Sequence, residues 1–215
     1  EILTSDMVSL NYNLNTKKFN LSTTYFDLEN FVLPYSSLST SFSSASWDLI
    51  DKKITFENLS DEINLSDFYS TNNNFSNLII RSSKGTFDIE QKKLFLTKVP
   101  DLQIADAYIV PYEGNVTVLE NSQISPLKNA DLILDTLNEY HKFIKADVKL
   151  ISKSKFEGRG IYEYINFDED TFEIPFSSFE LKTYENENNN IFSSTYSYGI
   201  VDKSKPILME PGFGF

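Results

Sequence analysis

Cysteine is absent from this sequence of 215 residues, and glycine, proline, methionine and tryptophan are scarce, with 7, 7, 2 and 1 copies. Without cysteine the chain can form neither a disulfide framework nor a zinc site with cysteine ligands. The compartment stays open, because many exported bacterial proteins also avoid cysteine. No apolar run approaches the roughly 18 residues of a membrane-spanning helix, so we expect no such helix in this segment.

Basic residues are also in the minority: 19 Lys and Arg against 31 Asp and Glu give a net charge of −12. The lysines are scattered along the chain, and the negative charge repels phosphate backbones, which argues against nucleic acid as a partner. The same charge opposes docking on anionic lipid.

Apolar and aromatic residues are plentiful: 40% of the chain is hydrophobic, with 18 Phe and 12 Tyr. That content suffices for a core, and aromatic residues among Ser, Thr and Asn suit half-buried pleated surfaces. We therefore expect an all-β fold. The chain begins at Glu1 without a leader and ends on Gly214-Phe215, and we expect it to be a processed or excised piece of a longer protein.

The most informative feature is a recurring unit of strand, polar turn with Lys-Lys, and strand. Alternation of apolar residues on both sides of a four-residue turn predicts an antiparallel hairpin with one buried face. The first lysine of the pair stands at positions 17, 52 and 92, and these intervals of 35 and 40 residues are typical of repeat architectures. The three copies are Tyr12–Leu14 to Phe19–Leu21, Trp47–Leu49 to Ile54–Phe56, and Phe87–Ile89 to Leu94–Leu96.

Two further hairpins lack the lysine pair. One runs from Tyr162–Tyr164 through 168–170 to Phe172–Ile174, and the other from Tyr196–Tyr198 through 202–203 to Ile207–Met209. Because these copies keep the strands without the lysines, we interpret the lysines as solvated turn and edge charges that discourage aggregation, not as ligand contacts. The alternative is that the hairpins are unrelated, since any all-β protein contains similar ones.

A second recurrence places Ala-Asp before alternating apolar residues, at Ala105-Asp106, Ala130-Asp131 and Ala146-Asp147. A small residue before a strand suits entry from a crowded corner, and we hypothesise a solenoid-like central part. The same region holds the one helix candidate, within 127–144, where apolar residues recur at spacings of three and four after Pro126. We favour strands there and keep the helix as the alternative.

Domain organisation is weakly marked. The chain is interpreted as one continuous β-rich segment, 1–215, with a subdivision into the Lys-Lys hairpin series, 1–98, and the Ala-Asp strands and aromatic hairpins, 99–215; the boundary is placed near 98–101. Polar runs without apolar periodicity predict loops at 70–74, 112–115 and 185–190.

No residue is nominated as catalytic, cofactor-binding or metal-binding. His141 is the only histidine, and a metal centre with Asp135 or Glu139 would have no recognised spacing, so a structural or surface role is favoured. No Gly-x-Ser-x-Gly motif supports a serine nucleophile. Asp168-Glu169-Asp170 with Glu173 could offer oxygens to calcium, but without the EF-hand pattern a solvated hairpin turn is favoured.

Two other features have structural and functional readings. Gly158-Arg159-Gly160 lacks the context of a phosphate loop and predicts a bulge or a close backbone approach. A ladder of aromatic residues could stack on sugar rings, but cross-strand packing is the favoured explanation. Its members are Tyr162, Tyr164, Phe167, Phe172, Phe176 and Phe179.

Four segments together resemble one group of proteins. They are the Trp47 hairpin, the Phe87 hairpin that leads to Val99-Pro100, Ala105–Pro111, and Phe156–Tyr164. Over roughly residues 45–175 they are similar to the very large repeat-rich β proteins of Bacteroidota, especially flavobacteria. The resemblance implies a bacterial cell-envelope location, in the periplasm or associated with the outer membrane, and a longer full-length chain. It implies no catalytic residue.

A second resemblance is to the lipid-bridging β-groove proteins of the AsmA/TamB and lipopolysaccharide-transport type, whose repeats also consist of short strand pairs. We therefore expect a non-enzymatic structural or interaction module of a cell-envelope protein, whose partners are other segments of the same long chain or envelope proteins. The alternatives are a lipid-conducting β-groove segment, which needs an open apolar groove, and a carbohydrate-binding or carbohydrate-active domain, which needs exposed rings or facing carboxylates.

Overall fold

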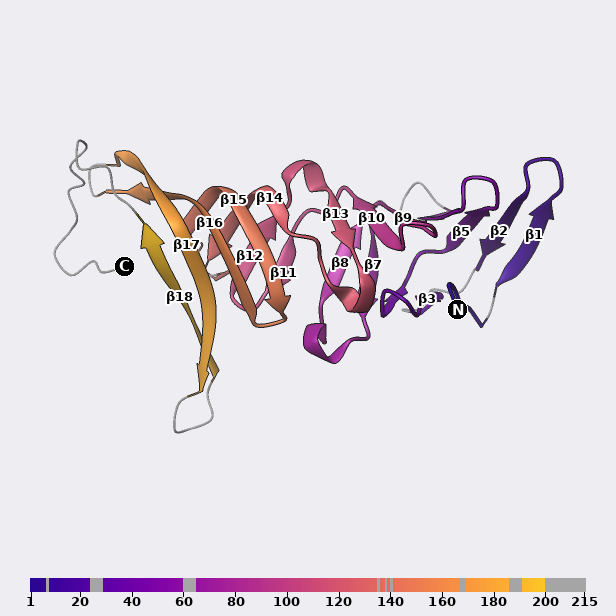
Figure 1. The fold of residues 1–215 in the computed structure, drawn as a ribbon, viewed down its shortest axis with the longest axis horizontal. Coiled ribbons are helices and arrows are strands. Elements are labelled where there is room, and N and C mark those ends of the chain that lie inside the picture. Colours follow the sequence, from indigo (N-terminus) through magenta and orange to yellow (C-terminus); the bar gives the residue numbers. More distant parts are fainter. Residues whose placement is uncertain are drawn as a thin grey trace. The chain divides into compact units, whose positions relative to one another are not determined.

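The computed structural model describes residues 1–6, 8–23, 29–59, 65–134, 136–137, 139, 141–166, 169–185 and 191–199, the last stretch and 182–185 as backbone only. Strands dominate these residues, and the all-β prediction is confirmed (Figure 1). Helical structure within them is confined to three 3-10 turns, Asn73–Phe75, Tyr112–Gly114 and Glu120–Ser122. The chain divides into two compact units, 1–102 with 113–125 and 103–112 with 126–215.

Unit 1 contains two antiparallel sheets. Sheet 1 has the order β1 (Ser9–Asn13), β2 (Lys18–Ser22), β5 (Ser44–Asp48), β6 (Lys53–Glu57), β9 (Lys84–Asp88), β10 (Lys93–Thr97) and β13 (Val116–Val118). Sheet 2 has the order β3 (Phe31–Leu33), β4 (Leu38–Thr40), β7 (Ser66–Ser70) and β8 (Ile79–Ser82). The three Lys-Lys hairpins are thus confirmed, and they lie side by side in sheet 1. Between them the chain crosses to sheet 2, so each of the first two Lys-Lys hairpins is followed by a hairpin in sheet 2.

The turns of the Lys-Lys hairpins share one construction. The side-chain oxygen of the last strand residue accepts two backbone N–H groups of the turn: Asn13 Oδ1 from Asn15 and Thr16 at 3.0 and 3.1 Å, for example. Asp48 and Asp88 form the same pair of bonds in their own turns. The first lysine of each pair has a left-handed backbone, with φ of 52°, 52° and 54° at positions 17, 52 and 92. The motif therefore runs from an Asx residue to Lys-Lys, and we call it the Asx-to-Lys-Lys turn.

Neighbouring hairpins also share one stacking contact. The carbonyl of Lys17 accepts the N–H of Leu49 at 3.2 Å, and the carbonyl of Lys52 accepts that of Ile89 at 3.0 Å. In both places the second strand of one hairpin pairs with the first strand of the next, with Lys18 opposite Asp48 and Lys53 opposite Asp88. Because the register is the same between β2 and β5 as between β6 and β9, the repeat in the sequence is also a repeat in the structure.

Aromatic rings fill the space between the two sheets of unit 1. The ring of Phe56 on sheet 1 lies 5.8 Å from that of Phe31 and 5.9 Å from that of Phe68, both on sheet 2. All three side chains are completely buried. Gly85 on β9 makes room for this packing, because a Cβ there would lie 2.7 Å from Phe68 Cζ. The core of unit 1 is thus closed by its own side chains around these rings.

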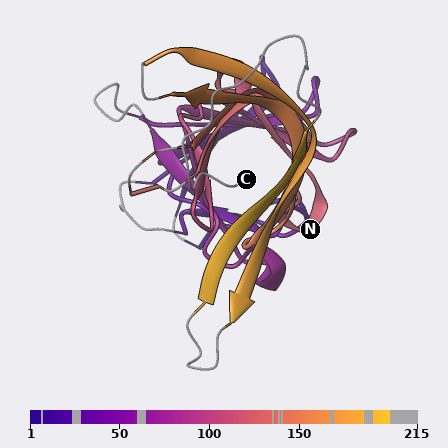
Figure 2. The ribbon, with the colours of Figure 1, turned by 90° about the vertical axis from the view of Figure 1, so that its left-hand side faces the viewer.

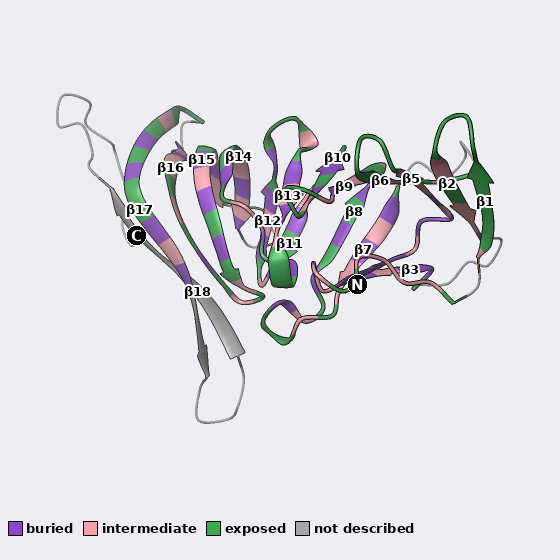
Figure 3. Cartoon of the chain, turned by 45° about the vertical axis from the view of Figure 1, so that its right-hand side comes forward, coloured by how far each residue is buried: buried purple, intermediate pink, exposed green. Residues whose placement is uncertain are grey.

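Unit 2 is built on a third antiparallel sheet, which begins at Leu102 of unit 1. Its order is β11 (Leu102–Ile104), β12 (Ala107–Val110), β14 (Leu127–Leu134), β15 (His141–Ser152), β16 (Lys155–Ile165), β17 (Thr171–Glu185) and β18 (Ile191–Gly199). The long strands curve strongly, as Figure 2 shows for β17 and β18 in orange and yellow. Buried and exposed residues alternate along β15 and β17, which appear as purple and green bands in Figure 3. The helix alternative within 127–144 is wrong, because the described residues of this stretch form β14, a turn at 136–137 and the start of β15.

The Ala-Asp recurrence marks strand bulges at two of its three copies. Ala130 and Ala146 lie directly opposite each other on β14 and β15, both completely buried. Each follows an extra residue with a left-handed backbone, Asn129 at φ 53° and Lys145 at φ 50°, where the register shifts. Ala105 differs, because with Asp106 it forms the two-residue turn between β11 and β12. The expectation that Ala-Asp stands at the entry to a strand is therefore wrong for the second and third copies, which lie inside β14 and β15.

Tyr162 and Tyr164 on β16 pair with Ile174 and Phe172 on β17, which confirms the fourth hairpin. Of the fifth, 196–198 lie on β18 and 202–209 lie outside the described residues. The loops at 70–74 and 112–115 contain 3-10 turns; in the third, 185 ends β17 and 186–190 are not described.

Candidate functional site

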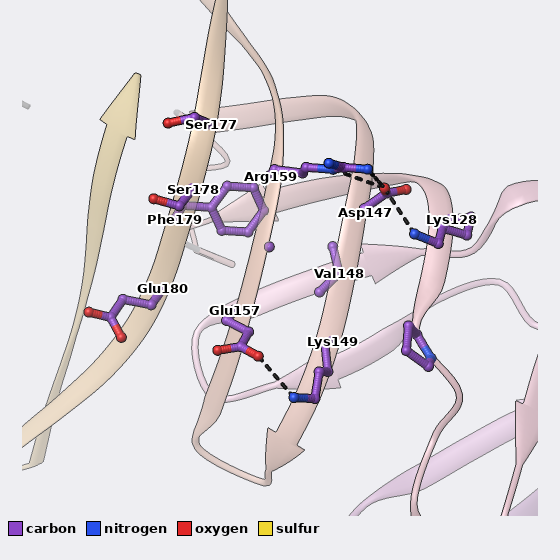
Figure 4. A pocket seen from close by; sticks show the side chains of 12 residues that line it. Lys128, Asp147, Val148, Lys149, Glu157, Arg159, Ser177, Ser178, Phe179 and Glu180 are labelled. Carbon is purple, nitrogen blue, oxygen red and sulfur yellow. Dashed lines mark hydrogen bonds and ion pairs between the residues drawn. The ribbon is translucent and has the colours of Figure 1, made fainter. Parts of the chain in front are cut away.

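A groove of about 480 Å³ in unit 2 crosses β15, β16 and β17 (Figure 4). Charged side chains of β14 to β17 make up much of its wall, and Val148, Gly158 and Phe179 form an apolar floor. Lys128, Lys149 and Arg159 carry positive charge, and Asp147, Glu157 and Glu180 carry negative charge. The charges of the lining residues therefore cancel.

Asp147 is the electrostatic centre of this groove. Its Oδ2 accepts hydrogen bonds from Lys128 Nζ at 3.0 Å and from Arg159 Nε and Nη2 at 3.1 and 2.9 Å. The hydrogen bond from Lys128, then that from Arg159, lowers the pKa of the Asp147 carboxyl below its usual value. A carboxylate held ionised by two cations is a poor general acid or base near neutral pH. Cross-strand ion pairs of this exposed kind contribute at most about 1 kcal/mol each to stability.

Gly158 and Gly160 let β16 approach its neighbours closely, as predicted. A Cβ at Gly158 would lie 2.5 Å from the carbonyl oxygen of Asp147 and 2.7 Å from the ring of Phe179. At Gly160 it would lie 3.0 Å from the Cβ of Ala146. The registers of both neighbouring strands shift beside these glycines. Beside these bulges Arg159 on β16 is opposite Asp147 on β15 and bonds to it.

His141 lies on β15 away from this groove. Its Nδ1 is 2.8 Å from the hydroxyl of Tyr162, and the two rings are 5.9 Å apart. Burial raises the pKa of Tyr162 above its usual value, so the tyrosine stays a neutral hydrogen-bonding partner. Of the two carboxylates considered as its metal partners, Glu139 is exposed and Asp135 lies outside the described residues. Among the described residues no group of three or more His, Asp and Glu is placed to hold a metal ion.

Glu169 and Asp170 of the acidic segment lie in the connection between β16 and β17. Asn166 closes this turn: its N–H donates to the carbonyl of Asp170 at 3.0 Å, and its Oδ1 accepts the N–H of Asp170 at 2.8 Å. Glu169, Asp170 and Glu173 are exposed, and Asp168 is not described. The predicted solvated hairpin turn is confirmed for the described residues.

The aromatic ladder packs inward. The rings of Tyr162 and Phe176 are 5.9 Å apart, and Phe143, which sequence reasoning did not include, lies 4.7 Å from Phe179. Tyr162, Phe176 and Phe179 are at most 6% exposed, so their faces are not available to a sugar ring. Phe167 lies outside the described residues.

Unit 1 has an apolar groove of about 470 Å³ beside β1, lined by Leu3, Thr4, Ser5, Asp6, Val8, Leu10, Phe19, Leu21 and Trp47. It lies where the inner face of the β1–β2 hairpin meets the N-terminal segment. The sequence identified Phe19, Leu21 and Trp47 as strand residues of hairpins. The repeat pattern alone does not show that the first hairpin lies at the end of its sheet, where these side chains line a groove.

Comparison with protein families, with curated proteins and with solved structures finds no match to this chain. The site is therefore interpreted from its own geometry. Within the described residues, no helix is long and apolar enough to span a bilayer.

Proposed function

We propose that this chain is a non-enzymatic structural and interaction module of a bacterial cell-envelope protein, in which hairpin repeats extend a β scaffold. One observation carries the proposal: successive Lys-Lys hairpins join through the same backbone contact, from Leu49 N–H to Lys17 and from Ile89 N–H to Lys52. A joint that repeats in one register provides a way of extending a sheet. The groove of unit 2 supports the same role, because its charged side chains bond to one another across strands.

A lipid-conducting segment is the second candidate, and the apolar groove beside β1 is the observation that favours it. Against it, rings fill the interiors of both units: Phe56 contacts Phe31 and Phe68 in unit 1, and Phe143 contacts Phe179 in unit 2. Acyl chains need continuous apolar space, which these contacts occupy.

The test is whether the chain retains lipid. The protein is expressed in a Gram-negative host, purified without detergent, and examined by native mass spectrometry and lipid extraction, before and after incubation with phosphatidylethanolamine vesicles. We expect the mass of the polypeptide alone in both samples. Lipid bound in stoichiometric amount, and lost when Leu10→Lys places a charge in the groove, would replace the structural role with lipid conduction.

A further inference from the structure

We propose that the free edge of β1, with the apolar groove beside it, binds a β-hairpin that carries an Asx-to-Lys-Lys turn, whose second strand pairs with β1. The inference rests on the proposed structural and interaction role and names the partner and the surface. β1 stands at the end of sheet 1, and all five of its residues are exposed, as its green ribbon in Figure 3 shows. No strand of the described residues pairs with its outer edge.

The neighbouring edge of sheet 2 is already occupied. Thr4 forms two backbone hydrogen bonds with Val32 on β3, at 2.9 and 2.8 Å, and the Ser5 hydroxyl donates to the carbonyl of Asn30. The N-terminal segment thus covers β3 and leaves β1 open. Unpaired strand edges are templates for another strand, and this one carries no proline and no charged side chain to block it.

The inner face of β1 is apolar and uncovered. Leu10 and Tyr12 pair with Leu21 and Phe19 on β2, so all four side chains lie on the face that is buried further along sheet 1. Leu10 is 62% exposed and Tyr12 is 41% exposed, whereas Phe56, opposite Ala45 in the same sheet, is completely buried. The Tyr12 and Phe19 rings lie 4.6 Å apart and extend the apolar surface of the groove to the edge.

The repeat identifies the occupant. At the two interior joints, the residue after the Asx position, Leu49 or Ile89, donates its N–H to the first lysine of the preceding hairpin. Leu14 stands at this position in the first hairpin, and the Asn13 side chain bonds to the N–H groups of Asn15 and Thr16 instead. The N–H of Leu14 is therefore placed to meet the lysine carbonyl of an incoming hairpin.

The same register fixes how that hairpin lies. β6 pairs with β9 so that Lys53 is opposite Asp88, Ile54 opposite Phe87 and Phe56 opposite Gly85. Transferred to β1, the second lysine of the partner stands opposite Asn13. Its two inward apolar residues then lie beside Tyr12 and Leu10 and cover part of the groove.

The probe is a backbone-cyclised peptide of residues 44–57, labelled with fluorescein and titrated with the full chain while anisotropy is recorded. Cyclisation is needed because an isolated hairpin is only marginally stable. We expect saturable one-to-one binding. A matched pair of variants tests the face: Leu10→Lys weakens binding at least about tenfold, whereas Asn11→Lys, with the same charge on the opposite face, leaves it within about twofold.

A third variant tests the edge itself. Leu14→Pro removes the proposed donor at a turn position that proline tolerates, and we expect it to weaken binding while Leu14→Ala does not. A peptide with Ile54→Asn and Phe56→Asn is expected not to bind.

Three results would overturn the inference: no saturable binding below about 1 mM peptide, equal effects of Leu10→Lys and Asn11→Lys, or a chain dimer sensitive to Leu10→Lys that binds no peptide. A chain that retains no lipid and binds no hairpin would refute this inference and leave the proposed structural role standing.

Discussion

Replacing Gly85 by alanine tests whether the interior of unit 1 is closed. The new Cβ would lie 2.7 Å from Phe68 Cζ, 3.1 Å from Phe68 Cε2 and 3.3 Å from Leu96 Cδ2. Phe68 is completely buried and its ring packs against those of Phe42 and Phe56, so it has no free space into which to move. Overpacking of this kind costs about 1 to 3 kcal/mol, and the lower flexibility of alanine in the unfolded chain offsets about 0.4 to 1 kcal/mol. We expect a net loss of about 1 to 2 kcal/mol.

A double-mutant cycle assigns that loss to the Phe68 ring. Phe68→Leu removes the ring atoms that the new Cβ would meet, and on its own it costs about 1 to 2 kcal/mol through the cavity it leaves. In the double variant the alanine occupies part of that cavity. The double variant should therefore lose about 1 kcal/mol less stability than the sum of the two single losses. Urea unfolding followed by fluorescence of Trp47, the only tryptophan, measures each variant within unit 1. Additive losses, or no loss in Gly85→Ala, would refute the closed core.

Three further predictions concern the turns, the half-buried hydroxyl of Tyr69 and the bulges. Because Lys92 has a φ of 54°, Lys92→Val should cost about 1 to 2 kcal/mol, whereas Lys93→Val, on the following strand, should be neutral or stabilising in the same unfolding assay. Burial, then the hydrogen bond to Asp67, raises the pKa of Tyr69 to about 12. Tyr69 therefore stays protonated in the folded chain while it ionises near pH 10 in the unfolded chain, so the free energy of unfolding falls from pH 10 to 12. Tyr69→Phe should show a smaller fall between these pH values. An equal fall would contradict the raised pKa of Tyr69. Gly158→Ala should lower the melting temperature by about 4 to 12 °C, because its Cβ would meet a backbone oxygen that cannot move aside; an unchanged melting curve would contradict the close approach.

The hairpins of sheet 1 could be predicted because every determinant is local. Each hairpin is a segment of about fourteen residues that contains the apolar alternation, the Asx residue and the lysine pair. The strand periodicity and the turn chemistry therefore predict the same hairpin. The role of the first lysine as a left-handed turn residue was not predicted, since lysine has no special preference for that conformation.

The hairpins of sheet 2 were missed because they carry no such alternation. β3 and β4 have three residues each, and the Leu38–Thr40 strand is buried on both faces. Ser39 and Thr40 read as polar loop residues, yet the Thr40 hydroxyl bonds to the carbonyl of Asp67 on a distant strand. Such pairing depends on the tertiary structure and leaves no periodic signal.

The sequence predicted the irregular strand segments that line the groove of unit 2, but not the contact between them. Asp147 and Arg159 belong to segments whose small residues predicted a crowded corner and a bulge. Their contact needs the extra residue Lys145, which shifts the register between β15 and β16. A slip of one residue turns every side chain to the opposite face, so the ion pair could not be derived from spacing alone.

Amide hydrogen exchange at three equivalent turn positions tests the shared hairpin joint most directly. The N–H groups of Leu49 and Ile89 bond to the preceding hairpin, whereas Leu14 stands at the equivalent position of the first hairpin, whose strand β1 is at the end of sheet 1. Nuclear magnetic resonance of the full chain should show protection at Leu49 and Ile89 and exchange at Leu14 near the rate of an unfolded peptide. Equal exchange rates at all three positions would contradict the repeated joint, and with it the proposed extension of the scaffold by hairpins.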